Sequence, residues 1–283
     1  MTKESTMKIG FSTQEISRPD VMESLKALKN YGFDSLQFNM LTVLSKELPD
    51  EIPDSIVDDI VAAKEVTNQE IVAINGTFNM INVNLKERHR GIENFSKIAS
   101  ICGRLNCNLI TLCTGTRNQD SMWMGHPDNQ STEAWRDLLY TTEQLLEIAE
   151  RYDVNLGIET EYSNVINTPE RAVEYIKEMQ SDRMKIVMDC ANLFHPGMAK
   201  PEKVRDVIQH GFDLLGEYVQ VAHGKDICAG EGICFTAAGL GIIDFPFFKE
   251  KLEEIKYTGP MILHGFKTEN QFAPSVAYLK KIF

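Results

Sequence analysis

The chain has 283 residues, of which 43% are hydrophobic and 25% are charged, and its formal net charge is −12 at pH 7. The length suits one large domain with its own core, and the composition is that of a globular chain rather than a disordered one. The acidic balance argues against a nucleic-acid-binding surface, which needs basic side chains to neutralise phosphates.

No apolar run in the sequence approaches the roughly 18 residues that a membrane span needs. Residues 1–7 are polar and lack the apolar core of a signal peptide. No linker, low-complexity tract or shift in composition divides the chain. We therefore expect a cytoplasmic protein in which residues 1–283 form a single domain.

Strand and helix patterns alternate from the start of the chain. Short apolar strands are predicted at residues 8–12, 35–40, 70–74 and 109–113. An amphipathic helix is predicted after each of them, at residues 21–28, 54–64, 86–105 and 132–152. The first helix follows Pro19 and Asp20, which are typical of a helix start.

The second half of the chain keeps the same rhythm. Strands are predicted at residues 155–159, 185–189, 218–223 and 261–264, and helices after Thr168, Pro201 and Asp244 and from the last strand to Phe283. Eight such units predict a parallel sheet with its helices outside, closed into a barrel. An open doubly wound sheet would carry a glycine-rich phosphate motif after its first strand, and residues 10–15 supply none. The sequence therefore predicts an α/β fold, a (β/α)8 TIM barrel.

Residues 114–131 form the longest irregular stretch of the sequence. Long loops inside compact domains are usually functional. In a barrel, this loop is expected to overhang the active face.

Four consecutive strands end in a side chain that can bind a metal ion. These side chains are Glu159, Asp189, His223 and His264. A barrel brings the carboxyl ends of its strands together at one face, where active sites lie. Carboxylate and imidazole groups suit a divalent ion such as Mn²⁺, Co²⁺, Zn²⁺ or Mg²⁺. The pattern predicts a metal site at this face.

The six cysteines contain no C-x-x-C pair; they are Cys102, Cys107, Cys113, Cys190, Cys228 and Cys234. We expect them to be reduced and structural, as in most intracellular chains. Cys228 and Cys234 flank a glycine-rich segment shortly after His223, so an added metal or redox role for this pair stays open.

The second half of the chain resembles a known family in the order of its motifs. The motifs are Leu156-Gly-Ile-Glu159, Met188-Asp-Cys-Ala-Asn192, Ala222-His-Gly-Lys-Asp226, Gly239-Leu-Gly-Ile-Ile-Asp244 and Tyr257-Thr-Gly-Pro-Met-Ile-Leu-His264. In this order they are similar to the sugar phosphate isomerase/epimerase family, whose barrels resemble xylose isomerase. The resemblance implies one divalent ion held by Glu159, Asp189, His223 and the last strand's residue, with a ketose bound through adjacent carbonyl and hydroxyl oxygens.

The chain departs from that family at two positions. The last strand of the family usually ends in a glutamate that is both ligand and acid/base, whereas this chain has His264. A histidine often found three residues after the aspartate is replaced by Asn192, although His195 lies three residues further on. Because a neutral imidazole brings no negative charge, we expect Mn²⁺, Zn²⁺ or Co²⁺ to be preferred over Mg²⁺.

The expected function is a metal-dependent isomerase or epimerase of a sugar or sugar acid, phosphorylated or not. A metal-bound carbonyl makes the neighbouring C–H bond acidic, and proton transfer proceeds through a metal-stabilised enediolate. Glu159 is the expected base, and either Glu161 or His264 is expected to replace the missing glutamate in the second proton transfer.

Several polar residues near strand ends are expected to contact the substrate. Arg117, with the hydroxyls of residues 114–116, suits a carboxylate or phosphate. Trp123 and His126 lie further along the same loop, where they could cover a sugar. Amides that suit sugar hydroxyls are Asn79, Asn164 and Asn192. Lys225 is also expected at the substrate site, and with Asp226 it is expected to support His223 or to cap the next element.

Three alternatives remain at this stage. A dehydratase could act on a related keto-polyol through the same intermediate, and a non-catalytic metal- or carbohydrate-binding barrel could have lost its acid/base at His264. Apurinic endonucleases of related barrels bind several zinc ions, but this chain has only six histidines and an acidic charge. The expected partner is a small sugar or sugar acid, with no nucleic acid and no membrane, and homo-oligomerisation is left open.

Overall fold

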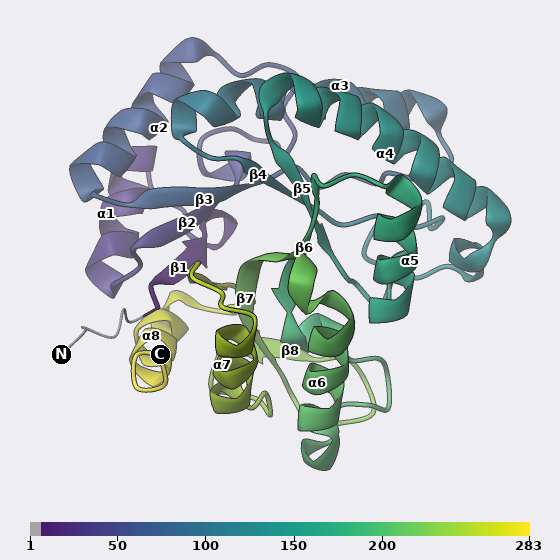
Figure 1. The fold of residues 1–283 in the computed structure, drawn as a ribbon. Helices are drawn as coiled ribbons and strands as arrows, with labels where there is room; N and C mark the ends of the chain where they lie inside the picture. Colours follow the sequence, from purple (N-terminus) through teal and green to yellow (C-terminus); the bar gives the residue numbers. More distant parts are fainter. Residues whose placement is uncertain (1–6) are drawn as a thin grey trace.

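Eight parallel strands close into a barrel in the computed structural model, which describes residues 7–283 (Figure 1). They are β1 (Ile9–Ser12), β2 (Ser35–Phe38), β3 (Glu70–Asn75), β4 (Leu109–Leu112), β5 (Asn155–Glu159), β6 (Met184–Asp189), β7 (Val219–Ile227) and β9 (Met261–Leu263). Each strand pairs with the next, and β9 pairs with both β7 and β1, which closes the ring. The predicted (β/α)8 barrel is confirmed.

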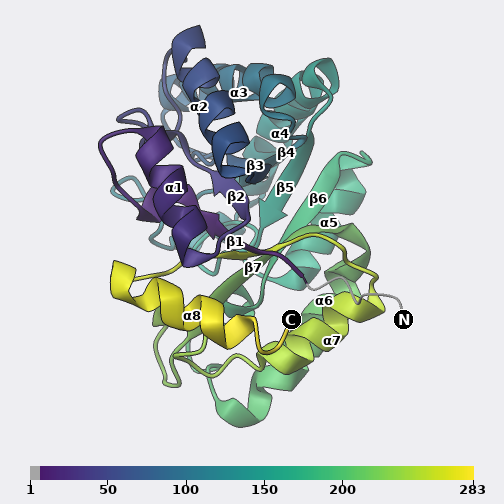
Figure 2. The ribbon, with the colours of Figure 1, turned by 90° about the vertical axis from the view of Figure 1, so that its left-hand side faces the viewer.

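An outer ring of helices covers the barrel. Its members are α1 (Val21–Tyr31), α2 (Asp54–Thr67), α3 (Leu85–Leu105), α4 (Thr132–Tyr152), α5 (Pro169–Met179), α6 (Val204–Leu215), α7 (Phe245–Glu254) and α8 (Phe272–Leu279). The last helix lies beside the first and completes the ring (Figure 2). Within the described part of the chain, no helix combines the length and apolar character needed to cross a membrane.

Short 3₁₀ helices connect these elements. They are η1 (Thr13–Glu15), η2 (Met40–Thr42), η3 (Pro127–Gln130), η4 (Cys190–Leu193), η5 (Pro201–Lys203), η6 (Gly216–Tyr218) and η7 (Glu269–Gln271). The helix expected to open at Pro201 therefore starts as η5, and α6 begins at Val204. The closing helix, expected to reach Phe283, ends at Leu279.

Side-chain caps explain why the helices begin where the sequence predicts. Asp20 accepts a hydrogen bond from Glu23 N at 2.8 Å, and Thr168 accepts one from Arg171 N at 3.3 Å. Asp244 caps α7 in the same way. Each cap accepts a hydrogen bond from a backbone N–H that has no partner inside its helix, and so fixes the residue at which the helix begins.

A small apolar layer from five strands fills the interior of the barrel. It consists of Ala73, Leu109, Val187, Val221 and Ile262. Gly10 also faces this layer, where a Cβ atom would collide with Ile262. The layer closes the inside of the barrel below the carboxyl ends of the strands, where the candidate ligands lie.

Strand β7 differs from its prediction because it does not end at His223. It continues to Ile227 and pairs in antiparallel register with β8 (Phe235–Ala237), which the sequence did not predict. Alternate residues of a strand share a face, so the continued strand places His223 and Lys225 on the same side. The hairpin gives the extended backbone of residues 225–227 hydrogen-bond partners beyond the barrel wall.

Candidate functional site

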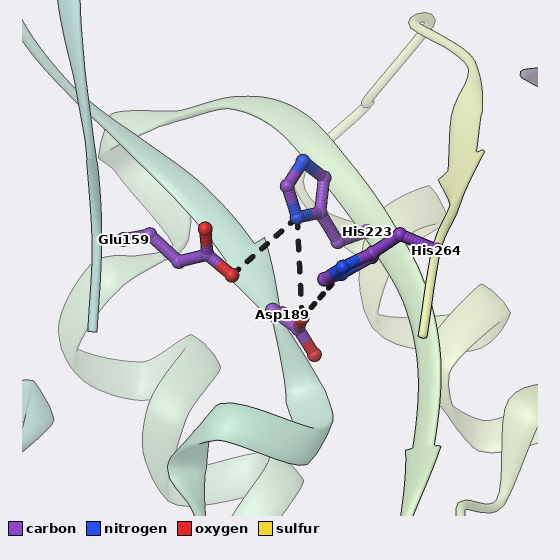
Figure 3. A group of neighbouring side chains, drawn as sticks. All are labelled: Glu159, Asp189, His223 and His264. Carbon is purple, nitrogen blue, oxygen red and sulfur yellow. Dashed lines mark hydrogen bonds and ion pairs between the residues drawn. The ribbon is translucent and has the colours of Figure 1, made fainter. Parts of the chain in front are cut away.

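The four predicted metal ligands converge at the carboxyl end of the barrel (Figure 3). Glu159 ends β5, Asp189 ends β6, His223 lies in β7 opposite Asp189, and His264 follows β9. One ligand atom from each residue lies within 4.8 Å of those from the other three. Four chain segments that are distant in sequence thus present two carboxylates and two imidazoles to one point.

Asp189 is the centre of this group. Its Oδ2 atom lies 2.8 Å from His264 Nε2 and 3.9 Å from His223 Nδ1, and His223 Nδ1 lies 3.4 Å from Glu159 Oε1 (Figure 3). Burial alone would raise the pKa of the Asp189 carboxyl group, but the neighbouring Lys225 and the two histidines lower it overall. Asp189 is therefore held as a carboxylate, the form that binds a cation.

His223 supplies the test of whether these residues fit a metal ion. Its Nε2 atom lies 2.8 Å from Gln37 Oε1, an acceptor, so Nε2 carries the proton in the neutral ring and Nδ1 carries a lone pair. Nδ1 is buried and has no hydrogen-bond partner, and it faces the oxygens of two carboxylates. In this tautomer the Nδ1 lone pair faces two carboxylates, and a cation bound between them would be stabilised by all three groups, so this donor set fits a divalent ion.

A second network surrounds the candidate ligands. Lys225 Nζ donates to Asn192 Oδ1 at 2.6 Å and lies 3.3 Å from Asp189 Oδ2. Asn192 Nδ2 donates to Glu159 Oε1 at 2.7 Å. Burial alone would lower the pKa of Lys225, but the carboxylates of Asp189, Glu159 and Glu161 raise it overall. A charged lysine and an amide therefore hold both carboxylates in position.

A cavity of about 370 Å³ opens beside the four residues, which is within the range of small-molecule pockets. Its lining residues are Ser12, Gln14, Gln37, Glu47, Asn75, Thr77, Cys113, Trp123, Glu159, Glu161, Tyr162, Asn192, His223, Lys225, Phe235 and His264. Burial raises the pKa of the Glu161 carboxyl group, with Lys225 opposing and Glu159 adding to the effect. The cavity thus combines a candidate metal site with a buried carboxyl group whose protonated form is favoured by burial.

The structure brings most of the predicted site residues to this cavity. Trp123, Glu161, Asn192 and Lys225 line it together with three of the four candidate ligands, and Asp189 lies directly behind them. Asp226, expected to support the site or the next element, accepts hydrogen bonds from the backbone of Gly239, Gly241 and Ile243. It therefore fixes the loop that leads to α7.

Arg117 and His126 lie away from the cavity lining. The Arg117 guanidinium donates to Asp137 Oδ2 at 2.6 Å and to the Ile81 carbonyl at 2.7 Å, so protein groups occupy the donors that were expected to bind a substrate anion. His126 accepts a hydrogen bond from Asp128 N at 3.2 Å and caps η3. Both residues stabilise the loop 114–131 rather than contact the cavity.

Asn79 and Asn164 also lie outside the cavity lining and are hydrogen-bonded to the loop 114–131. Asn79 accepts from Thr116 N at 3.1 Å and donates to Thr116 O at 2.8 Å. Asn164 accepts from Gly115 N at 2.7 Å and donates to Met122 O at 3.0 Å. These amides supply hydrogen bonds to the backbone of the loop, and neither residue lines the cavity.

Sequence reasoning missed Gln37, Glu47 and Phe235, which also line the cavity. Gln37 carried a signal, since it is a glutamine in the otherwise apolar end of β2 and is buried at 6% exposure. Glu47 lies in a connecting segment and Phe235 in the unpredicted strand β8, so neither could be placed at the site from its neighbours in sequence.

Comparisons with known proteins agree with this architecture. The model of a family described as a xylose isomerase-like TIM barrel matches residues 25–282. No curated protein matches the sequence. The chain is similar to the solved structure of the apo form of 3-keto-D-glucoside 4-epimerase, YcjR, from E. coli, with 18% identity, a TM-score of 0.74 and coverage of 97% of this chain and 99% of that chain.

Two further solved structures have similar scores. D-psicose 3-epimerase from Clostridium cellulolyticum H10, solved with D-tagatose, is 14% identical, with a TM-score of 0.72 and coverage of 98% of this chain and 99% of that chain. The IOLI protein with a binding zinc atom is 19% identical, with the same TM-score and the same coverage. At such identities the likeness concerns the fold, and it agrees with the closed barrel described above.

Proposed function

The chain belongs to the xylose isomerase-like TIM barrel family, and from this premise we propose that it is a divalent-metal-dependent isomerase or epimerase of a small sugar. The observation that carries the proposal is the convergence of four ligand side chains around the unpartnered Nδ1 of His223, beside a cavity of small-molecule size. Two of the similar structures are those of sugar epimerases, which supports this choice of chemistry.

In this proposal Glu159, Asp189, His223 and His264 hold one divalent ion. When bound, the ion supplies a positive charge that polarises a carbonyl group and stabilises negative charge as a neighbouring C–H bond is broken. Two carboxylates and two imidazoles form a mixed oxygen and nitrogen donor set. Such a set favours Zn²⁺, Co²⁺ or Mn²⁺ over Mg²⁺, which prefers oxygen ligands.

Glu159 and Glu161 are the proposed proton-transfer residues, with His264 as the alternative to Glu161. Glu159 is oriented by the Asn192 amide, so its carboxylate has a fixed position at the cavity wall. Glu161 is buried at 7% exposure, and burial raises its pKa, which suits a group that both accepts and returns a proton. A proton removed by one of these groups and returned at another carbon or face would isomerise or epimerise a ketose.

The charges around the cavity favour an uncharged sugar over a sugar phosphate or sugar acid. Among the described residues, Lys225 is the single lysine or arginine of the lining, and Asp189 and Asn192 already engage it. Three carboxylates line the same cavity, from Glu47, Glu159 and Glu161. A substrate phosphate would therefore meet more negative than positive side chains, whereas sugar hydroxyls can donate to carboxylates and amides.

The test is carbon-bound hydrogen exchange with solvent deuterium. Protein loaded with Zn²⁺, Mn²⁺ or Co²⁺ is incubated in D₂O with unphosphorylated ketoses, their phosphate esters and sugar acids, and deuterium at carbons next to the carbonyl is measured by NMR. We expect uptake from at least one unphosphorylated ketose, lost in metal-free protein and in Glu159→Gln. Glu143→Gln is the matched control because Glu143 is exposed on α4.

Three other outcomes of this experiment would point to a different substrate or a different function. Uptake from sugar phosphates alone would contradict the uncharged substrate but keep the chemistry. Loss of a substrate hydroxyl would indicate a dehydratase. Saturable binding of metal and sugar without any exchange across the panel would contradict the proposed enzyme and favour a binding protein.

A further inference from the structure

The hairpin of β7 and β8 brings two cysteines face to face beside the cavity. The register pairs Ile227 with Phe235, so Cys228 and Cys234 are the next opposed pair, and Cys228 N donates to Cys234 O at 2.8 Å. Their Sγ atoms lie 3.2 Å apart. Opposed residues of antiparallel strands have Cα atoms about 4.5–5.5 Å apart. This range lies within the about 4.4–6.8 Å that a disulfide spans, so the backbone already suits a bridge.

Exposure distinguishes this pair from the remaining cysteines. Cys234 is exposed and Cys228 is partly exposed, whereas the other four, Cys102, Cys107, Cys113 and Cys190, are buried. Burial raises the pKa of the Cys107 thiol to about 11 and raises the pKa of the other three buried thiols as well. The pKa of the Cys228 thiol is also raised, first by its hydrogen bond with Cys234 and then by burial, so access to an oxidant in solution is what separates this pair from the four buried thiols.

We propose that Cys228 and Cys234 are a reversible disulfide site that takes a peroxide as its oxidant. The exposed Cys234 thiolate attacks a peroxide oxygen, the O–O bond breaks, and Cys234 becomes a sulfenic acid as the first water leaves. The Cys228 thiolate then attacks the Cys234 sulfur, the S–O bond breaks, and the second water leaves. Two thiols lose two protons and two electrons, and hydrogen peroxide is reduced to two water molecules. A dithiol reverses the reaction by exchange.

The bridge would act on the wall of the cavity through Phe235. This residue directly follows Cys234 and lines the cavity, and the centroid of its ring lies 3.8 Å from Lys225 Nζ. The turn between the cysteines contains Gly230 and Gly232, where an added Cβ atom would meet nothing within 4 Å, and Gly230 N donates to Ala199 O at 3.0 Å. A disulfide removes conformational freedom from the segment that it closes, so oxidation would hold Phe235 against Lys225. The inference rests on the hairpin and does not depend on the proposed function.

The experiment is peptide mapping of the reduced full-length chain after treatment with hydrogen peroxide. Free thiols are alkylated before digestion with trypsin, which cuts after Lys225 and Lys249 and leaves both cysteines in one peptide, residues 226–249. We expect the peptide from the oxidised chain to carry no alkyl group and to have the mass of its unalkylated dithiol form less two hydrogen atoms. If the oxidised chain is treated with dithiothreitol before alkylation, both cysteines of the peptide should be alkylated. Cys228→Ser and Cys234→Ser should abolish the product, and the control Cys102→Ser should keep it.

Two outcomes would overturn the proposal. One is a sulfinic acid on Cys234 while Cys228 stays alkylated, and the other is a disulfide formed only between chains. Hydrogen exchange tests the effect on the hairpin, since residues 226–237 should exchange more slowly in the oxidised chain than in the reduced one. Equal exchange rates would contradict the claim that the bridge holds Phe235 in place.

Discussion

Gln37 is the residue whose replacement tests most sharply how His223 is prepared for a metal ion. Its Oε1 atom lies 2.8 Å from His223 Nε2, and both side chains are buried, at 6% and 1% exposure. Gln37→Leu removes the acceptor while keeping a similar volume. His223 Nε2–H then loses its partner, and the ring loses the hydrogen bond that keeps the lone pair on Nδ1.

The size of the effect can be worked out in two ways. A buried donor left without a partner costs about 1–3 kcal/mol. Loss of an outer partner of a metal-binding histidine typically costs about 10–100-fold in metal affinity. This factor equals about 1.4–2.7 kcal/mol. The first cost falls on the folded chain with or without metal and should lower its unfolding midpoint. The second sets the binding defect, so we expect Gln37→Leu to weaken Zn²⁺ or Mn²⁺ binding by about 10–100-fold. Gln37→Glu keeps an acceptor at this position and should retain the affinity.

Competition with a chromophoric chelator measures these dissociation constants, and circular dichroism in EDTA verifies that each variant is folded without metal. If Gln37→Leu binds metal as tightly as the wild type, the hydrogen bond does not prepare His223. If Gln37→Glu binds metal as weakly as Gln37→Leu, the site depends on how the side chain at position 37 packs and not on its hydrogen bond with His223.

Three further predictions concern the metal, the proton transfers and the loop 114–131. Removing metal with EDTA should lower the midpoint of thermal unfolding, and readdition at 100 times the dissociation constant should restore about 2.7 kcal/mol; an unchanged midpoint would argue against a site in the folded chain. At saturating metal, either Glu161→Gln or His264→Gln should lower turnover by about 10²–10⁴-fold; full turnover in both would refute two-residue proton transfer. Burial alone would raise the pKa of Asp137, but hydrogen bonds from Arg88 and Arg117 lower it below its ordinary value of 3.8. Its carboxylate therefore stabilises the fold above that value, so Asp137→Asn should lower the unfolding midpoint at pH 7, and its difference from the wild type should shrink as the pH falls below 3.8. A difference independent of pH would show that the Asp137 charge is not the cause.

The strand ends were predictable because the relevant signal is local. Apolar residues directly precede Glu159, Asp189 and His264. In a closed barrel of parallel strands, the carboxyl ends of all strands lie at the same face, so these residues must lie near one another. The helix starts were predictable for a similar reason, since a cap such as Thr168 acts within its own first turn.

The loop contacts were not predictable because their partners are distant in sequence. Arg117 looked like an anion-binding residue, but its guanidinium pairs with Asp137, twenty positions further on in α4. Asn164 likewise holds Gly115 across forty-nine positions. A sequence pattern shows that such a residue can donate or accept, but it does not show which groups the folded chain places beside it.

The hairpin was missed for another physical reason. Residues 228–234 contain two glycines and read as an irregular loop, while β8 is a three-residue strand stabilised by its pairing with β7. Short strands carry little periodicity of their own. Phe235 and the close approach of the two exposed cysteines therefore became visible only in the structure.

The most direct test of the central claim is the number of metal ions bound by each chain. Purified wild-type protein loaded with Zn²⁺ or Mn²⁺ and freed of excess ion should retain one equivalent by elemental mass spectrometry. Asp189→Ala and His223→Ala should retain none while keeping the circular dichroism of the wild type. Asp182→Ala is the matched control, because Asp182 is exposed just before β6, at the strand end opposite Asp189, and it should retain the full equivalent. One equivalent of metal retained by both Asp189→Ala and His223→Ala would contradict the site.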